Sequence, residues 1–371
     1  MATRVAGAYT ERSGQVRGVP VLDRLERKTR AIRRRMWTRL DLIWHRGRRR
    51  TEFLYAFYDL SVSPATFDIL KFLVLAEIRR QQIGCMGIHI VIVPGEIDGF
   101  RMDDNDHYDV DHKQWRLRNV LVPCCALLPD PCCMTVCGIR EEAHALRSSV
   151  AMHVFPDGYS VRHPVAHYED RRFFAAVAGC AEFPAMMARE EPMRRMGDWI
   201  ENVAGGRRVV TISLREADYE PARNSNLMAW VEFARSLDLS TYCPVFVRDI
   251  DRAMDKTPNE LREFIVCKEA VWNLELRAAL YSLSYVNMAV SGGPALVCLL
   301  LRNPPCLVFK MVVPSCGAST ERHLRSQGWT IGEQGEWASP FHRIVWEDDH
   351  VEAIKREFHA LTRSINKRSF G

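Results

Sequence analysis

The 371-residue sequence predicts an α/β protein of two domains, each built on a parallel β-sheet, which face each other across a cleft. Short apolar runs rich in β-branched and aromatic residues alternate with helical patterns, and strands separated by helices imply right-handed crossovers and parallel pairing. This alternation occurs twice, on either side of a segment without a clear period at about 153–205. A hydrophobic content of 47% in a chain of this length is enough for two cores.

A basic segment precedes the first strand. Between Asp23 and Arg50 the chain carries a local net charge of +9, whereas the whole chain carries +5, so the remainder is acidic at −4. Apolar residues recur there at steps of three, four or seven, and Trp37 and Trp44 lie beside them. The segment therefore predicts a basic amphipathic helix at residues 21–50, within an arm of residues 1–50. The apolar positions are Leu22, Leu25, Ile32, Met36, Leu40 and Ile43.

This arm has two readings. A basic helix edged with tryptophan suits the surface of an anionic membrane, where each cation near the lipid contributes about 1 kcal/mol. The alternative is a helix packed on its own domain with solvated arginines. Nucleic acid is disfavoured as a partner, because the rest of the chain is acidic and no binding motif accompanies the basic run.

The first domain is predicted at residues 51–170, with strands and helices in alternation. Ser63 is a plausible cap for its first helix, and Gly84 follows that helix. The predicted elements are strand 53–58, helix 64–82, strand 88–93, helix 108–128 and strand 132–136.

The second domain is predicted at residues 206–371, after a linker at 171–205. The same alternation there predicts a second parallel sheet, so both domains are Rossmann-like in architecture and ligands should bind at the carboxyl ends of their strands. Its strands are predicted at 208–214, 244–247, 286–290, 306–309 and 344–346, and its helices at 227–237, 270–283, 295–301 and 351–365.

Polar residues gather in the loop after the first strand of the second domain. Two guanidinium groups, a phenol, an amide and a hydroxyl at a carboxyl edge are suited to a phosphate or a sugar. The alternative is structural: Asn224 and Ser225 cap the next helix, and the two arginines of the loop pair with Glu216 and Glu220. The five candidate residues are Arg215, Tyr219, Arg223, Asn224 and Ser225.

A tight turn follows the strand at 286–290. Ser291, Gly292, Gly293 and Pro294 lead directly into a helix, and the free amide groups of a helix start attract an anion. The glycines would let the backbone approach a ligand closely. Lys310, at the end of the next strand, would add a third cation to the same sheet edge.

These features together resemble the carboxyl-terminal half of nucleotide-sugar glycosyltransferases of the GT-B type. The resemblance covers Val209 to Phe309 and is closest in order to the fucosyltransferase-like and heptosyltransferase-like branches. It implies a GT-B-like fold in which the second domain binds the nucleotide-sugar donor and the first binds the acceptor. It also implies that Arg215 and the Ser291–Pro294 turn hold the donor diphosphate, without a metal or other cofactor.

The function implied by this resemblance is sugar transfer from a nucleotide-sugar donor to a lipid-linked or surface-polysaccharide acceptor, a glycan or glycolipid. The basic arm would then give access to the membrane. Two alternatives remain open: a nucleotide-sugar epimerase or hydrolase of the same fold, and a non-catalytic protein that binds a nucleotide or glycan.

An inverting transfer also needs a base for the attacking hydroxyl. Asp59, just past the first strand, is the first candidate, although it could instead cap a turn with nearby serines. Glu96 and Asp98, after the second strand, are alternatives. His89 lies within a strand and is interpreted as a satisfied core histidine.

Two clusters suggest metal binding at first sight. The acidic run Asp103–Asp111 lacks the glycine and terminal glutamate of a calcium loop and precedes a helix, so we interpret it as a solvated, helix-capping loop. The cysteines at 124, 125, 132, 133 and 137 are without C-x-x-C spacing and are interpreted as buried thiols. No metal site is predicted.

No segment of signal-peptide or membrane-span character occurs in the sequence. Most of the twelve cysteines, such as Cys267, Cys298 and Cys306, lie in apolar runs, as free thiols do. We therefore expect a cytoplasmic protein without disulfides, peripheral on the inner face of the membrane if the arm binds lipid.

Overall fold

The computed structural model describes residues 53–102, 108–129, 132–150, 153–180, 183–302, 304–335 and 339–369. All of these belong to the unit Arg50–Gly371. The predicted basic helix of residues 21–50 lies outside the described residues. Within this unit, "first half" denotes residues 53–177 and "second half" denotes residues 190–369.

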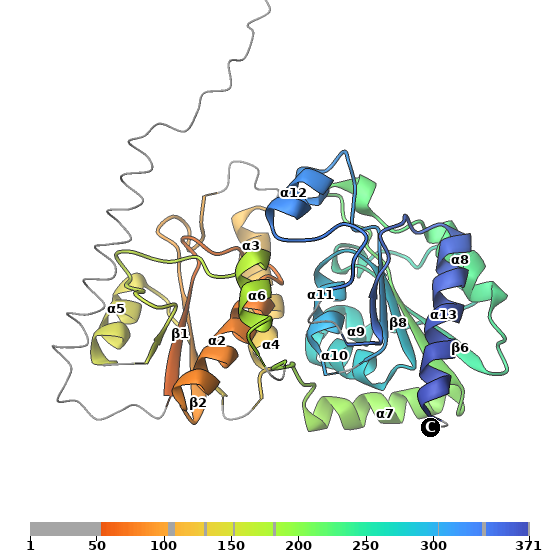
Figure 1. Ribbon diagram of the computed structural model, residues 1–371, viewed down its shortest axis with the longest axis horizontal. Helices are drawn as coiled ribbons and strands as arrows, with labels where there is room; N and C mark the ends of the chain where they lie inside the picture. The colour runs from red at the N-terminus through yellow and green to blue at the C-terminus, as the bar shows by residue number, and fades with distance from the viewer. Residues whose placement is uncertain are drawn as a thin grey trace, which may run out of the picture. The chain divides into compact units, whose positions relative to one another are not determined.

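The first half contains a parallel four-stranded sheet of order β3-β2-β1-β4. Helix α5 covers one face of this sheet, and α2 and α4 cover the other (Figure 1). The predicted strands are confirmed, and the central pair is fully in register from Phe53↔Gly87 to Asp59↔Val93. The elements are β1 (Phe53–Asp59), α2 (Ile69–Ile83), β2 (Gly87–Val93), α3 (Val110–Arg116), η1 (Leu117–Leu121), α4 (Val122–Cys125), β3 (Cys132–Val136), α5 (Arg140–Ser149) and β4 (Val154–Phe155).

The first helix begins five residues later than predicted. Helix α2 starts at Ile69, so Ser63 is not its cap and instead lies buried in the turn after β1. Gly84 ends the helix in the left-handed conformation, as expected of a glycine at this position (φ 71°). The delayed start leaves residues 60–68 as a loop at the carboxyl end of β1, which places Thr66 and Asp68 next to the ligand edge of the sheet.

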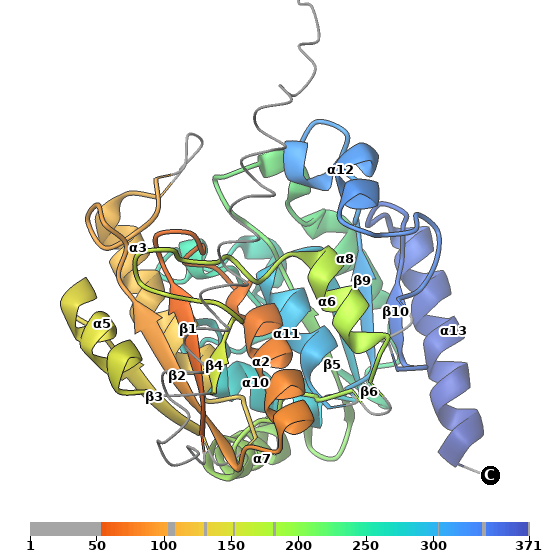
Figure 2. The same cartoon turned by 60° about the vertical axis from the view of Figure 1, so that its left-hand side comes forward.

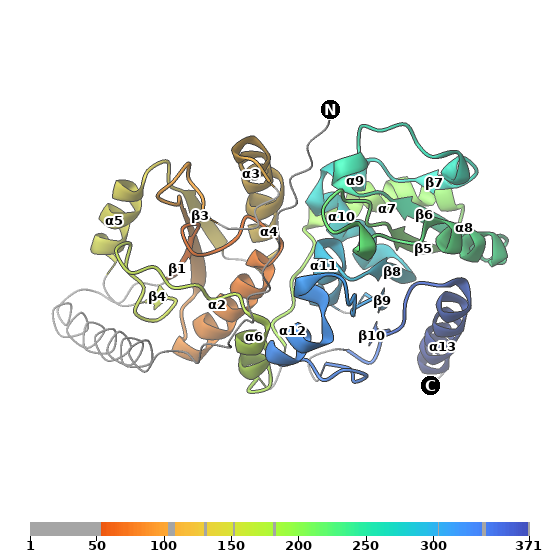
Figure 3. The same cartoon turned by 90° about the horizontal axis from the view of Figure 1, so that it is seen from above.

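The second half contains a parallel six-stranded sheet of order β10-β9-β8-β5-β6-β7. Helices α8 and α13 cover one face, and α10 and α11 lie on the other (Figure 3). Its principal elements are β5 (Arg208–Ser213), α8 (Leu227–Ser236), β6 (Tyr242–Val247), β7 (Ile265–Val266), α9 (Glu269–Trp272), α10 (Leu274–Leu283), β8 (Val286–Val290), α11 (Gly293–Leu300), β9 (Cys306–Phe309), α12 (Glu321–Ser326), β10 (His342–Ile344) and α13 (Val351–Ser369).

The segment expected to hold the linker contains two helices. Helix α6 (Asp170–Val177) packs on α2 in the first half, and α7 (Glu190–Ala204) packs on α10 and β5 in the second. The halves are joined further by α2 lying against α11 (Figure 2) and by a parallel bridge between Met186 and Leu301. One buried cluster includes apolar residues of both sheets, so the two halves share a core. No described helix is long and apolar enough to span a bilayer.

Candidate functional site

A cavity of about 710 Å³ lies at the carboxyl ends of both sheets. The first half contributes the loop and first turn around Thr66–Lys71, and helix α3. The second half contributes the segments that follow β5, β6 and β8. The structure therefore contains a cavity lined by both halves, at the strand ends where the parallel topology predicts a ligand.

Seven of the eleven candidate residues named from the sequence line this cavity. The remaining four, Asp59, Asn224, Ser225 and Lys310, do not. The seven are Arg215, Tyr219, Arg223, Ser291, Gly292, Gly293 and Pro294.

Arg215 lines the cavity and also closes its own loop. Its guanidinium donates to the carbonyl oxygens of Tyr219 at 2.6 Å and Glu220 at 3.0 Å, and to Oδ1 of Asn224 at 2.5 Å. Burial and the neighbouring Arg223 lower the pKa of Arg215 from its ordinary value. Glu220 and Asp249 oppose this lowering, and an anion bound in front of Arg215 would oppose it further.

Asn224 and Ser225 shape the loop rather than the cavity wall. The Ser225 hydroxyl accepts from the backbone N–H of Arg215 at 2.9 Å, and the Asn224 amide donates to the carbonyl of Ala217 at 2.8 Å. Neither residue caps α8, because Asn226 does so by accepting from the N–H of Ala229. Their contribution is to hold Arg215 in place.

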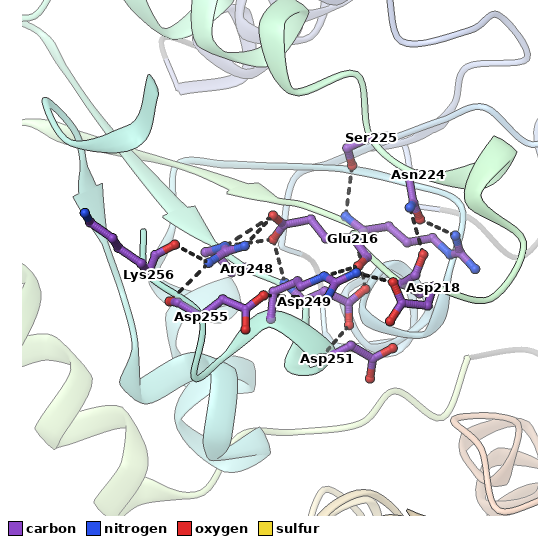
Figure 4. Close-up of polar contacts among 12 residues, drawn as sticks. Glu216, Asp218, Asn224, Ser225, Arg248, Asp249, Asp251, Asp255 and Lys256 are labelled. Atoms are coloured by element: carbon purple, nitrogen blue, oxygen red, sulfur yellow. Dashed lines mark hydrogen bonds and ion pairs between the residues drawn. The ribbon is translucent and has the colours of Figure 1, made fainter. Parts of the chain in front are cut away.

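Ion pairs brace the loops after β5 and β6. Arg223 pairs with Glu220 at 2.8 Å, as the structural alternative predicted, but Glu216 pairs with Arg248 at 2.7 Å instead of with a loop arginine. Figure 4 shows Arg248 between Glu216 and the backbone of Asp255 and Lys256. The two loops thus form one rigid support for the second-half wall.

The two glycines of the turn have different surroundings. A Cβ added at Gly292 would lie 3.9 Å from Cδ of Arg215, an ordinary contact, so a small side chain has room there. A Cβ added at Gly293 would lie 2.1 Å from the Phe67 ring of the first half. Gly293 is therefore required for the approach of Phe67, whereas the sequence predicted that both glycines admit a ligand. Gly292 remains the N-cap of α11, with Pro294 in the first turn.

The prediction that Lys310 adds a third cation to the site is wrong. Its ammonium contacts Asp348 at 3.0 Å and Asp349 at 3.2 Å, and donates to the carbonyl of Asn224 at 3.1 Å. Asp349 is completely buried and also accepts from the indole of Trp230. Lys310 therefore neutralises a buried acid behind the loop.

Asp59 does not reach the cavity either. It is completely buried, where Arg140 donates to its two oxygens at 2.9 and 3.1 Å and the Tyr159 hydroxyl donates at 2.8 Å. Its backbone and side chain also hold the turn after β1, with Ser61 donating to Oδ1. The expectation that Asp59 faces the cleft fails because three donors from distant segments hold its carboxylate inside the first half.

The alternative acids do not line this cavity either, and the histidine is satisfied. Neither Glu96 nor Asp98 lines it, and Glu96 is exposed. His89 lies 2.8 Å from the Thr135 hydroxyl through Nε2 and stacks on Tyr55, although it is half-buried at the sheet surface rather than in the core.

The first-half wall carries a carboxylate that the sequence reading missed. Asp68, beside the start of α2, has a side chain that is 34% exposed and lines the cavity. It accepts from the Thr66 hydroxyl at 2.6 Å and pairs with Lys71 at 2.8 Å. Lys71 also contacts Asp170 at 2.5 Å, and Asp170 accepts from the indole of Trp329 at 2.8 Å.

The charge states of this group follow from its contacts. Burial opposes ionisation of Asp68, but the ammonium of Lys71 and hydrogen bonds from Lys71 and Thr66 outweigh burial and lower the pKa of Asp68. Burial likewise opposes the charge of Lys71, but Asp68 and Asp170 raise its pKa above the ordinary value. The carboxylate is therefore ionised and oriented near neutral pH.

The acidic run and the cysteine cluster, for which no metal site was predicted, are described in part. Among the residues that the structure describes, no three His, Cys, Asp or Glu side chains are grouped to hold a metal ion. Residues 103–107 of the acidic run lie outside the described residues; within the rest of that run, Asp109 caps α3. Cys124, Cys125 and Cys137 are buried as predicted, but Cys132 is half-buried and Cys133 is exposed because β3 is an edge strand.

The comparisons with known proteins concern the fold alone. No family model matches the sequence, and no curated protein matches it. The structure is similar to E. coli ADP-heptose LPS heptosyltransferase II, with 12% identity, a TM-score of 0.53, and coverage of 85% of this chain and 99% of that one. This likeness confirms the predicted GT-B-like fold of two parallel-sheet α/β domains.

Two further structures are matched at lower scores. The glycosyl transferase family 9 protein of Veillonella parvula has 11% identity and a TM-score of 0.45, over 85% of this chain and 89% of that one. The E. coli heptosyltransferase WaaC with ADP has 12% identity and a TM-score of 0.40, over 85% of this chain and 99% of that one.

Proposed function

We propose that the protein is a glycosyltransferase that moves a sugar from a nucleotide-sugar donor to a lipid-linked or surface-polysaccharide acceptor. The proposal rests on one observation: a cationic wall from the second half and a carboxylate from the first half line the same cavity. The second half presents Arg215, Arg223 and the start of α11, and the first half presents the ionised carboxylate of Asp68. The likeness in fold to a heptosyltransferase supports the same class of reaction.

The second-half wall is suited to the donor diphosphate. Guanidinium groups bind phosphate oxygens through parallel hydrogen bonds, and the amide groups at a helix start add partial positive charge. As the bond between sugar and diphosphate breaks, negative charge grows on the leaving phosphate. Preorganised cations stabilise that charge without moving, which is the largest contribution such a wall can make to the rate.

The first-half wall supplies the base. We assign this role to Asp68 rather than to Asp59, because Asp68 is exposed to the cavity while Asp59 is enclosed by Arg140 and Tyr159. In an inverting transfer, the carboxylate of Asp68 accepts the proton as the acceptor hydroxyl attacks the anomeric carbon. Thr66 and Lys71 orient that carboxylate through the contacts given above.

A thermal-shift panel of nucleotides and nucleotide sugars tests the function. A donor at a hundred times its dissociation constant should add about 2.7 kcal/mol of stability. We propose that cationic side chains replace a metal at the diphosphate, so the shift should persist in a chelator. The absence of a shift with every nucleotide would contradict the proposal, and a shift that requires Mn²⁺ would overturn its metal-free part.

The basic arm gives a second prediction, which concerns location. We propose that the protein acts in the cytoplasm, with the arm of residues 1–50 bound to the inner face of the membrane through its basic segment 21–50. Deleting these residues should abolish cosedimentation with anionic liposomes, because the segment 23–50 carries the local charge of +9. Neutral liposomes serve as the control. Equal binding by the full and truncated proteins would remove the membrane role, and loss of the melting transition would instead indicate a packed helix.

A further inference from the structure

Arg116, the last residue of α3, is a buried arginine in the first-half wall of the cavity. It is 7% exposed, and its Nε donates to the carbonyl oxygen of Ala65 at 2.7 Å. Its guanidinium carbon lies 4.9 Å from the ring centre of Tyr108, which also lines the cavity. One hydrogen bond and one stacking contact fix the plane of the guanidinium. A guanidinium held in this way can bind a carboxylate or a phosphate through two parallel hydrogen bonds.

Within the part of the chain that the structure describes, the two terminal nitrogens of Arg116 have no protein partner. Among the described residues, neither nitrogen makes a hydrogen bond or an ion pair, and neither is sealed away from the cavity. A guanidinium offers five N–H donors, of which the carbonyl of Ala65 takes one. A charge that is more than nine-tenths buried without a counter-charge is costly, so this side chain is arranged for an anion that arrives with the ligand.

The acids of the facing wall do not fill this role. Asp249 accepts from the backbone N–H groups of Glu216 and Asp251 and, among the described residues, makes no ion pair with Arg116. Burial and Asp249 raise the pKa of Asp251, and His112 and Arg116 oppose that rise, yet Asp251 and Arg116 make no ion pair. Arg116 and Asp251 therefore face a common space that a ligand can enter.

We propose that Arg116 binds a phosphate or carboxylate group of the ligand and that this group belongs to the acceptor. The second part rests on the proposed function. The acceptor is the favoured source because Arg116 is tied to Ala65, three residues before the base Asp68, whereas the diphosphate cations lie on the other half. The acceptor would then be a sugar phosphate or a sugar acid whose anionic group sits close to the attacking hydroxyl.

Calorimetric titration of the full chain with inorganic phosphate tests the site. The titration is run with a saturating nucleoside diphosphate from the thermal-shift panel, which occupies Arg215 and the start of α11. The parent should bind phosphate, and Arg116→Gln should weaken binding by tenfold or more, since hydrogen bonds to charged groups are lost. Arg118→Gln is the matched control, because Arg118 is exposed on the same helical run and should leave the affinity unchanged.

The outcomes distinguish two questions: whether Arg116 forms an anion site, and whether the donor or the acceptor supplies the anion. Arg116→Lys keeps the positive charge but loses the two parallel N–H donors of the guanidinium, so it should fold and bind phosphate several times more weakly than the parent. This variant serves if Arg116→Gln does not fold. Equal phosphate affinity in the parent and a folded Arg116 variant, or no phosphate binding by the parent, would overturn the anion site. If phosphate binds without nucleotide, depends on Arg116, and is displaced by the nucleotide, the group belongs to the donor and the acceptor assignment fails. None of these titrations needs sugar transfer, so their failure is distinct from failure of the proposed function.

Discussion

Asp68→Asn should lower turnover by about a hundredfold or more while leaving donor affinity nearly unchanged. The amide keeps the shape of the side chain but cannot accept the proton of the attacking hydroxyl, so the loss falls on the transition state. Initial rates with saturating donor and acceptor measure the first effect, and calorimetric titration of the donor measures the second. Turnover close to that of the parent would remove Asp68 from the mechanism.

Asp59→Asn is the matched control, because it makes the same chemical change in a carboxylate that the cavity does not contain. The loss of this carboxylate would leave the partly buried guanidinium of Arg140 without its counter-charge, which costs up to about 3–5 kcal/mol of stability. We therefore expect a lower melting temperature for the Asp59 variant and a lower turnover for the Asp68 variant. A lower turnover for the Asp59 variant, with normal turnover for the Asp68 variant, would instead assign the base to Asp59 at the end of β1.

The pH dependence of turnover gives an independent check on the base. Because the pKa of Asp68 is lowered, the reactive carboxylate form is lost only as the pH falls below about 4, the ordinary value for aspartate. Removing the ammonium in Lys71→Met takes away the main cause of that lowering, so the acid limb should move to higher pH. An acid limb in the same place in both proteins would show that another group titrates.

Arg215→Ala should weaken the binding of a nucleoside diphosphate by about 1.5–3 kcal/mol, the usual strength of hydrogen bonds to a charged group. Arg215 follows β5 at the ligand edge and lies next to Gly292 at the start of α11, so we expect its guanidinium and the helix amide groups to act on the same anion. Calorimetric titration with melting curves measures the change. Unchanged affinity in the folded variant would place the donor elsewhere.

The loop contacts of Arg215 require a second variant. Arg215 holds Tyr219, Glu220 and Asn224, so its removal could act through the loop rather than through lost phosphate contacts. Asn224→Ala removes one of these loop contacts without touching the cavity wall. If Arg215 binds the diphosphate directly, Asn224→Ala should weaken binding far less than Arg215→Ala does. Equal losses would assign the effect to loop order.

The second half was easier to predict than the first because its site lies directly at strand ends. The runs 286–290 and 306–309 are short and mostly apolar, a Ser-Gly-Gly-Pro turn follows the first of them, and the structure reproduces both as buried strands. Arg215 and the Ser291–Pro294 turn were therefore placed at the right edge from periodicity alone. The strands β4 and β7 were missed because two residues give no periodic signal.

The first-half site could not be read in the same way because long-range contacts decide it. Asp59 looked available, but its partners Arg140 and Tyr159 are 81 and 100 residues away in the chain. Pro64 suggested a helix start, and the actual start at Ile69 moved Asp68 to the cavity. The pair Thr66 and Asp68 before an apolar run was a local signal of that start.

The contact of Asp170 with Trp329 has a consequence for motion. Trp329 belongs to the second half, and the carboxylate it holds contacts Lys71, which in turn pairs with Asp68. Any rotation that separates the halves at this point therefore removes a hydrogen bond from Asp170, whose carboxylate then competes more strongly with Asp68 for the ammonium of Lys71. The contact with Trp329 thus helps to keep Lys71 shared between the two acids, so the orientation of Asp68 depends on the two halves staying together at this point.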